Sequence, residues 1–350
     1  MQFFNKNSKI SIFYDILAKS SLKSKINLFK NIKDYYLEPT IISFSPIFLQ
    51  IEPTTFCNLK CKFCHNVDLK NKTYISFEKF KYIISQFPYV KKINLVGLGE
   101  PLMNPDLIDI IAFLNQQNIK VGFATNTMLL DEKISKRLID AGLSWIYFSI
   151  DSADPQSFET LRIGANLKQI INNIKNFIKL NNNVVETGIA TVIGKHNIDS
   201  FSNIIDLTHS LGINKIFTQT IHFWGREDYK NKFFNYSLQK EPFIQKLKKI
   251  AQYARSKNIR LIFENIPDKT KSRGCKWPWK SLYITVDGYI TPCCMHGADP
   301  NIINFGNIFE QNINNILNSE DYQNFRKQLK SHTPPQICKN CTSYYKTLKI

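Results

Sequence analysis

The fold is decided by the stretch between residues 51 and 65, which reads IEPTTFCNLKCKFCH. It begins at the end of a short apolar run, residues 47–51, of the kind that forms a buried strand. Cys57, Cys61 and Cys64 follow in one loop, with three and then two residues between them. A buried strand that leads directly into a loop of three thiols indicates a sheet protein with a metal-type site beside its first strand.

Strand-like apolar runs alternate with amphipathic helical stretches from Ile47 onward. This alternation is typical of βα units around a parallel sheet. Ser76 is the expected N-cap of the first helix. Six strands predict an incomplete barrel, and a further short strand is expected at residues 259–264. The six expected strands are residues 47–51, 92–96, 121–125, 145–150, 187–193 and 215–222, and the clearest expected helices are 76–87, 106–117 and 237–257.

The chain divides into three predicted parts. Residues 1–46 are expected to form a basic helical arm, because Ile10, Phe13, Ile16 and Leu17 have the spacing of one helix face. Residues 47–267 form the predicted barrel. Residues 268–350 form a smaller α+β domain, in which Asp287-Gly288 between two apolar runs predicts a β-hairpin, followed by a helix over residues 312–329.

Composition and charge exclude several classes of protein. The chain has 350 residues, with 46 Lys and Arg against 28 Asp and Glu and a formal net charge of +18. No basic–aromatic recognition motif accompanies this charge, so a solvated basic surface is favoured over a nucleic-acid site. No apolar run approaches the roughly 20 residues that span a bilayer, and no signal peptide is visible, so we expect a cytoplasmic protein. The eight cysteines fall into two groups, which favours clusters over disulfides.

The three-cysteine loop has a specific chemical use. Three thiolates leave one iron of a four-iron cluster open, and an open iron is what chelation of S-adenosylmethionine (SAM) through its amino and carboxylate groups requires. The alternative is a zinc site, which needs a fourth Cys or His nearby. His65 is the local candidate, but its adjacency to Cys64 makes joint ligation of one ion awkward.

The cysteine spacing, with the aromatic Phe63 before its last member, resembles the signature of the radical SAM superfamily. The resemblance implies that Phe63 packs near the adenine of SAM. Residues 97–101, GLGEP, resemble the family's Gly-Gly-Glu-Pro edge with Leu98 as a departure, which implies that Gly99 and Glu100 meet the SAM ammonium. An ordinary strand-to-loop turn is the alternative for this edge. Further implied SAM contacts are Asn126, Ser149, Asp151 and Arg162, with Thr191 as a weaker candidate.

Arg162 has two open interpretations. The resemblance implies that it pairs with the SAM carboxylate, whereas its position in Thr160-Leu161-Arg162 equally fits an exposed charge on a helix.

The C-terminal part contains the other five cysteines. Residues 288–293, GYITPC, and 305–308, FGNI, resemble the SPASM/twitch extensions of radical SAM enzymes. The full predicted fold is therefore a partial (β/α)6 TIM-like barrel followed by a small SPASM/twitch domain. A full SPASM domain has seven cysteines for two auxiliary clusters, so five imply one second [4Fe-4S] cluster. Its implied ligands are Cys275, Cys293, Cys338 and Cys341.

Two choices remain at this second site. Cys293 and Cys294 are adjacent, and adjacent residues of an extended strand point to opposite sides, so one is a ligand and the other packs. The hairpin motif favours Cys293. Four thiolates also suit a tetrahedral zinc ion, which is the alternative to the auxiliary cluster.

The resemblance implies an enzyme that cleaves SAM reductively to a 5′-deoxyadenosyl radical and abstracts hydrogen from a substrate. Four protein ligands close the second cluster, so its implied role is electron transfer and the enzyme is predicted to be a dehydrogenase-like oxidoreductase. The favoured substrate is a small polyhydroxylated molecule, such as a sugar or aminocyclitol. A peptide substrate is the alternative, disfavoured because the arm lacks the strand-rich pattern of a peptide-recognition domain.

The implied partners are that substrate and an electron donor such as flavodoxin or ferredoxin. A hypothesis of another class is a non-catalytic, metal-stabilised protein that binds nucleic acid, and the SAM motifs argue against it. No catalytic acid or base is identified from the sequence.

Overall fold

The computed structural model describes residues 21–220, 241–264, 267–272, 274–295, 298–331, 333–339 and 341–347. The helix face expected from Ile10 to Leu17 lies outside these residues. Within the predicted arm, α2 (Leu22–Leu37) is a helix whose N-cap, Ser21, accepts a hydrogen bond from Ser24 N. No helix in the described part of the chain is both long and apolar enough to cross a membrane.

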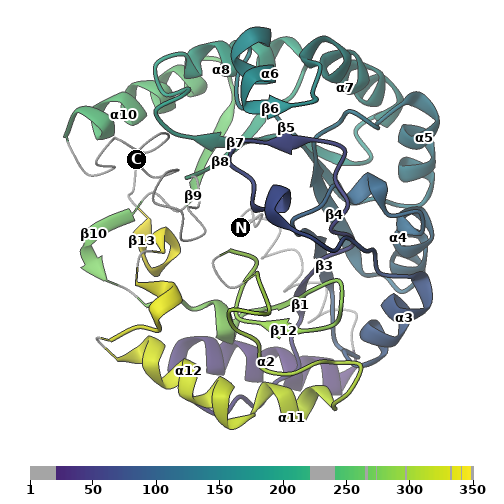
Figure 1. Ribbon diagram of the computed structural model, residues 1–350, viewed down its shortest axis with the longest axis vertical. Coiled ribbons are helices and arrows are strands. Elements are labelled where there is room, and N and C mark those ends of the chain that lie inside the picture. The colour runs from purple at the N-terminus through teal and green to yellow at the C-terminus, as the bar shows by residue number, and fades with distance from the viewer. Residues whose placement is uncertain are drawn as a thin grey trace.

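One mixed sheet organises the molecule. In the described residues it has nine strands in the order β12-β11-β1-β3-β4-β5-β7-β8-β9, and every neighbouring pair except β11–β12 is parallel. Seen down the short axis of the molecule, the sheet curves inside a ring of helices (Figure 1). The strands are β1 (Phe48–Ile51), β3 (Lys92–Leu95), β4 (Lys120–Thr125), β5 (Trp145–Ser149), β7 (Glu186–Ile193), β8 (Lys215–Thr220), β9 (Arg260–Glu264), β11 (Leu282–Ile284) and β12 (Ile290–Thr291).

Side-chain alternation separates the two faces of this sheet. Ile93 and Leu95 of β3 belong to the large core between the sheet and its helices, whereas Trp145, Tyr147 and Phe217 form a separate cluster on the other face. The outer helices are α3 (Phe77–Ser85), α4 (Leu107–Gln116), α5 (Glu132–Asp140), α6 (Pro155–Leu161), α7 (Leu167–Asn181), α8 (Phe201–Ser210) and α10 (Glu241–Ser256). This arrangement leaves the carboxyl ends of the strands at one edge, where functional loops follow.

Helix starts follow the local sequence. Ser76 is the N-cap of α3, as expected, and accepts from Lys79 N at 3.4 Å. Asp106 precedes α4 but caps the neighbouring helix instead, because its Oδ2 accepts from Phe77 N at 2.8 Å. The first two helices of the barrel are therefore tied to each other at their amino ends.

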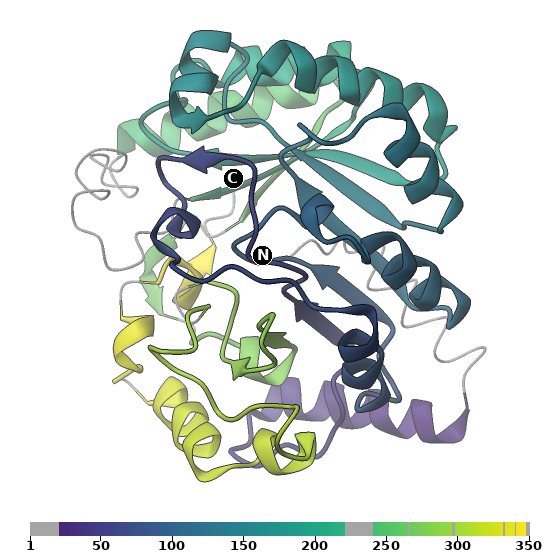
Figure 2. The ribbon, with the colours of Figure 1, turned by 45° about the vertical axis from the view of Figure 1, so that its right-hand side comes forward.

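The C-terminal residues return to the start of the sheet. The hairpin expected at Asp287-Gly288 is present, and its first strand, β11, pairs in parallel with β1. Figures 1 and 2 both show α2 beside α11 (Ile313–Leu317) and α12 (Glu320–Lys330). Arg326 joins these elements, donating to Thr40 O at 2.9 Å and to Leu317 O at 2.7 Å. The remaining elements here are β10 (Pro267–Ser272), η3 (Trp277–Trp279), η4 (Gln336–Cys338), η5 (Thr342–Tyr344) and β13 (Tyr345–Thr347).

The predicted fold class is confirmed, with two differences in detail. The sheet is wider than the six expected strands, because the separately expected strand β9 extends it at one end and the hairpin strands β11 and β12 extend it at the other. The helix expected over residues 312–329 is two helices, since Ser319 begins α12 by accepting from Tyr322 N. The domain boundary near residue 268 stays a prediction.

Candidate radical SAM site and auxiliary cysteine pocket

The three-cysteine loop is held from both sides. Its short strand β2 (Lys60–Cys61) pairs antiparallel with β6 (Arg162–Ile163), which places Cys61 opposite Arg162. The loop ends at η1 (His65–Asp68), where Asn66 Nδ2 donates to Thr55 O at 2.6 Å. The loop is thus fixed against both the start of the barrel and the segment after α6.

The thiols of this loop are costly to ionise in the bare protein. Burial raises the pKa of Cys57, Cys61 and Cys64, that of Cys61 to about 11, and the Arg162 guanidinium opposes this effect at Cys61 and Cys64. A metal cation that takes the proton's place relieves this cost. Three soft thiol donors in one loop therefore fit an iron–sulfur cluster.

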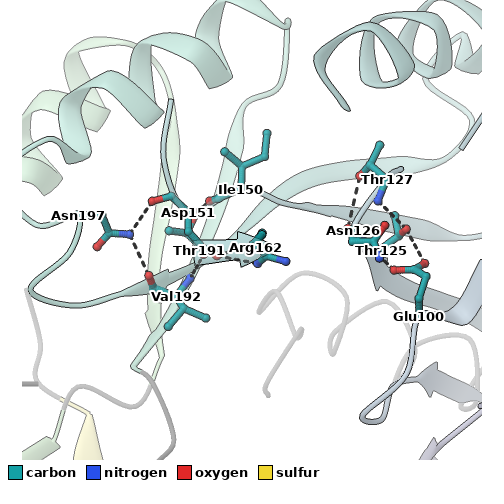
Figure 3. Close-up of polar contacts among 10 residues, drawn as sticks. All are labelled: Glu100, Thr125, Asn126, Thr127, Ile150, Asp151, Arg162, Thr191, Val192 and Asn197. Carbon is teal, nitrogen blue, oxygen red and sulfur yellow. Dashed lines mark hydrogen bonds and ion pairs between the residues drawn. The ribbon is translucent and has the colours of Figure 1, made fainter. Parts of the chain in front are cut away.

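Glu100 lies at the start of η2 (Pro101–Met103), directly after the glycine edge. Its carboxylate is 3% exposed, and burial raises its pKa. Thr125 Oγ1 donates to Oε1 and Asn126 N donates to Oε2, each at 2.7 Å (Figure 3). Glu100, in the loop that follows β3, is thereby joined to the carboxyl end of β4.

Asn126 connects this acid to the cysteine loop. Its Nδ2 donates to Asn58 Oδ1 at 2.8 Å and lies 3.9 Å from Cys57 Sγ. Its backbone N–H is bound by Glu100, so Glu100, Asn126 and the cysteine loop form one connected group.

Asp151 and Arg162 form a second polar group at the ends of β5 and β7. Arg162 Nε and Nη2 lie 2.8 and 2.7 Å from Asp151 Oδ2, while Val192 N donates to Asp151 Oδ1 at 2.8 Å (Figure 3). Although burial disfavours the charged guanidinium, Asp151 holds the pKa of Arg162 above its usual value. Arg162 is 8% exposed, which contradicts its interpretation as an exposed helix charge.

The other predicted SAM contacts lie around these groups. Phe63 is half-buried, with its ring centroid 5.6 Å from Arg162 Cζ. Ser149, also half-buried, ends β5. Thr191 is buried and its hydroxyl donates to Ile150 O at 2.6 Å, which gives it a role in joining two strands.

Gly99 is required by the chain's own packing. A Cβ at this position would lie 2.2 Å from Thr54 O and 2.6 Å from Phe56 O. The absence of a side chain at Gly99 therefore lets its backbone approach the segment that leads into the cysteine loop, and its implied contact with SAM stays a prediction.

The C-terminal cysteines line one pocket. Its wall contains Cys275, Cys293, Cys294, Cys338 and Cys341. Apolar groups complete the wall, among them Trp277, Pro292, Phe325, Leu329 and Ile337. No three His, Cys, Asp or Glu side chains in the described residues converge as for a single metal ion. Cysteine thiols in an apolar pocket are a donor set that suits an iron–sulfur cluster.

The adjacent thiols of this pocket have different neighbours. Burial raises the pKa of Cys338, and the nearby Cys293, Cys275 and Cys341 raise it further. Burial likewise raises the pKa of Cys294 to about 11, but its neighbours include Cys293 and Gln50 of β1. Both adjacent thiols line the pocket, so the choice of Cys293 as the ligand stays a prediction.

Sequence reasoning missed two polar residues of these sites. Asn197 Nδ2 donates to Asp151 O and Val192 O, each at 2.9 Å, and so fixes the loop after β7. Glu52 is 3% exposed at the end of β1, and burial raises its pKa to about 7. An acid placed directly after an apolar strand was the available signal for Glu52.

Comparisons with known proteins agree with this arrangement. A model of the radical SAM superfamily matches residues 51–208, and a model of the SPASM iron–sulfur cluster-binding domain matches residues 275–342. The chain is 24% identical to the tungsten-containing aldehyde ferredoxin oxidoreductase cofactor-modifying protein of Pyrococcus furiosus, over 84% of this chain and 87% of that protein. It is 27% identical to a probable GTP 3′,8-cyclase of Methanocaldococcus jannaschii, over 73% and 86%.

Solved structures share the fold. SuiB of Streptococcus suis superposes with a TM-score of 0.70 at 16% identity, covering 98% of this chain and 87% of that chain. The protein anSMEcpe with bound AdoMet superposes with a TM-score of 0.63 at 18% identity, covering 85% and 86%. The two matched domains imply a SAM-binding [4Fe-4S] cluster, SAM and auxiliary iron–sulfur ligation, as expected from the cysteines. The chain is thus a member of the radical SAM superfamily with a C-terminal SPASM-type domain.

Proposed function

We propose that this chain is a radical SAM oxidoreductase that oxidises a small polyhydroxylated molecule. In this proposal Cys57, Cys61 and Cys64 hold the SAM-binding [4Fe-4S] cluster. The auxiliary [4Fe-4S] cluster is held by Cys275, Cys293, Cys338 and Cys341. When bound, the first cluster would supply the electron that cleaves SAM to the hydrogen-abstracting 5′-deoxyadenosyl radical. The second would accept the electron that the resulting substrate radical loses together with a proton.

The polar groups at the strand ends orient SAM. Glu100 and Asn126 lie beside the cysteine loop, where a carboxylate and an amide can accept from the SAM ammonium. Arg162 is positioned by Asp151 and can exchange part of that ion pair for the SAM carboxylate. Phe63, beside Arg162, offers an aromatic face for the adenine.

One observation carries the assignment of a net oxidation. The four thiols of the proposed ligand set line a pocket with an apolar wall, and burial raises the pKa of three of them, Cys275, Cys338 and Cys341. Four protein ligands leave no position on a four-iron cluster for substrate, so the chemistry that remains for it is electron transfer. An oxidation is the reaction that needs such an acceptor after hydrogen abstraction.

Two buried amides support a neutral, hydroxyl-bearing substrate. Gln50 of β1 and Asn94 of β3 are register partners, 0% and 1% exposed. Their strand neighbours Leu49, Ile51 and Ile93 face the helices, so the amides face the barrel interior. Neither amide atom of Asn94 has a hydrogen-bond partner among the described residues, whereas the Gln50 amide neighbours the Cys294 thiol. Amides donate and accept together, which suits hydroxyl groups.

A peptide is the competing substrate. SuiB, which shares the fold, has been solved with its precursor peptide SuiA. The two substrate classes, polyols and peptides, are distinguished by finding which of them transfers hydrogen to 5′-deoxyadenosine.

The test uses the anaerobically reconstituted protein with SAM and reduced flavodoxin. We would supply perdeuterated hexoses and cyclitols in one set of reactions and deuterated peptides in another. Transfer of deuterium to 5′-deoxyadenosine from a polyol, with a product two hydrogens lighter, is the expected result. Transfer from peptides alone would replace the proposed substrate class, and a polyol product without net oxidation would remove the electron-acceptor role.

A further inference from the structure

The carboxylate of Glu52 binds two loops, one that follows β3 and one that follows β11. Glu52 follows β1, and its own N–H donates to Ile284 O of β11 at 2.9 Å. Its Oε1 accepts from Leu98 N at 2.8 Å, and its Oε2 accepts from Val286 N at 3.2 Å. One side chain therefore binds the backbone of two loops that are far apart in sequence.

Both loops lead to a proposed cofactor site. Leu98 belongs to the glycine edge, two residues before Glu100, whose carboxylate binds Thr125 and Asn126. Val286 lies between β11 and the Asp287-Gly288 turn, in the hairpin that continues to Cys293. A displacement of the Glu52 carboxylate would therefore release both loops at once.

The strand ladder does not make this connection by itself. The register of β1 with β11 and with β3 ends at Ile51. The Glu52 side chain lies between the two loops at the point where backbone pairing stops.

The fit around the carboxylate is close. A Cβ on Gly97 would lie 2.3 Å from Glu52 Cγ and 2.4 Å from Oε1. Any side chain at position 97 would therefore push the carboxylate away from the Leu98 and Val286 amides.

The geometry points to Glu52 as a positioning residue that fixes the glycine edge of the SAM site and the auxiliary-cluster hairpin at one relative position. This inference rests on the proposed function only in naming the two cofactor sites. Glu52 reaches no reacting atom, and it acts through the two backbone amides that it binds.

The pH profile offers a signature of this role. The titratable groups that act on Glu52 are Tyr283 of β11 and Asp287 of the hairpin turn. Protonation near neutral pH weakens the carboxylate as an acceptor, because a neutral oxygen attracts an N–H less than a charged one does. Both amides should then loosen together as the pH falls.

The experiment is amide hydrogen exchange of the reconstituted holoprotein, resolved at Leu98 and Val286. We would compare the wild type with Glu52→Ala, Glu52→Gln, Gly97→Ala and a matched control, Glu186→Gln. Glu186 binds Lys215 and Tyr147 at the opposite end of the barrel. Electron paramagnetic resonance of the two reduced clusters in the same samples would report the magnetic coupling between them.

We expect Glu52→Ala to lower the protection of both amides about ten-fold, which corresponds to one lost charge-assisted hydrogen bond at each. Gly97→Ala should reproduce this effect from the opposite side of the contact, and Glu52→Gln should affect at least one amide and remove the pH profile. The coupling between clusters should change in the same variants, and Glu186→Gln should match the wild type.

Loss of protection at one amide alone in Glu52→Ala, or a wild-type pH profile in Glu52→Gln, would overturn the inference. Unchanged coupling between clusters would also overturn it. A wild-type protein that fails to load iron would instead contradict the proposed function, while exchange at Leu98 and Val286 would still decide whether Glu52 binds both loops.

Discussion

The two groups of cysteines lie in different chemical surroundings. Around the first loop, Arg162, Asp151 and Glu100 provide buried charges that bind one another or backbone amides. Around the second group, Trp277, Phe325 and other apolar side chains form the wall of the pocket. The same donor atom, the cysteine sulfur, is thus presented once in a polar site and once in an apolar one.

This difference supports the proposed roles of the two sites, in which the first binds a small molecule and the second only holds a cluster. A zwitterionic ligand such as SAM needs charged partners of both signs, which the first site contains. A cluster whose ligands all come from the protein needs no charged side chains to bind a further molecule. Apolar side chains around it are sufficient, because they shield it from water. The predictions below test this contrast, beginning with the largest effect.

Replacement of Cys61 should remove one function and spare the other. We expect Cys61→Ala to abolish 5′-deoxyadenosine production. The auxiliary cluster should stay visible by electron paramagnetic resonance, because the two proposed clusters have no cysteine ligand in common. The measurement is product analysis by mass spectrometry together with iron content. Undiminished SAM cleavage by this variant would show that the first site has been misassigned.

Replacement of Cys293 and replacement of Cys294 should have opposite effects on the auxiliary cluster. Cys293→Ala should lose or damage the auxiliary cluster, because Cys293 neighbours Cys275 and Cys338, whereas Cys294→Ala should keep it. Iron and sulfide content with the spectrum of the cluster would measure this. If Cys294→Ala empties the site and Cys293→Ala does not, the ligand is the other thiol.

Removal of the Glu100 carboxylate should weaken SAM binding. We expect Glu100→Ala to cost about 1.5–3 kcal/mol of binding free energy, the range for a hydrogen bond to a charged group. Isothermal titration with SAM under anaerobic conditions is the measurement. Thr125→Val is the control, because it removes a partner of Glu100 but leaves the carboxylate, and an equal loss in both variants would assign the effect to the network.

The smallest effect concerns the dependence of stability on pH. Burial raises the pKa of Glu52 from 4.5 to about 7, so the folded chain keeps a proton that the unfolded chain has already lost. The contribution of Glu52 to stability is therefore greatest at low pH and falls as the pH rises toward its folded pKa. Between pH 6 and pH 7 this decrease is about 1 kcal/mol.

Glu52→Gln should remove that decrease, since the amide does not titrate. Thermal unfolding of the wild type and the variant across this pH interval would measure it. An equal pH slope in both proteins would mean that Glu52 has an ordinary pKa in the folded chain.

Local sequence signals predicted most of the fold and part of the site. The strands around Ile93 and Phe123 were predicted within about one residue, because a buried parallel strand is a continuous apolar run. The break at Ser319 was missed because the apolar spacing continues across it, although a Ser followed by acidic residues is a helix start.

The long-range contacts could not be predicted from the sequence. Glu52 and Val286 are 234 residues apart, and no local pattern states that β11 will pair with β1. The burial of Arg162 likewise depends on the cysteine loop folding onto the end of α6. A single sequence gives residue types and local spacing, whereas these contacts depend on which strands become neighbours.

The parallel pairing of β1 with β11 also has a consequence for synthesis of the protein. The ribosome produces β1 among the first strands, but one edge of it keeps its backbone groups unpaired until Leu282–Ile284 have emerged. During most of translation the nascent chain therefore presents an open strand beside the cysteine loop. The strand that closes this edge precedes Cys338 and Cys341 in the chain, so the full set of auxiliary thiols exists only after the partner of β1 has been made.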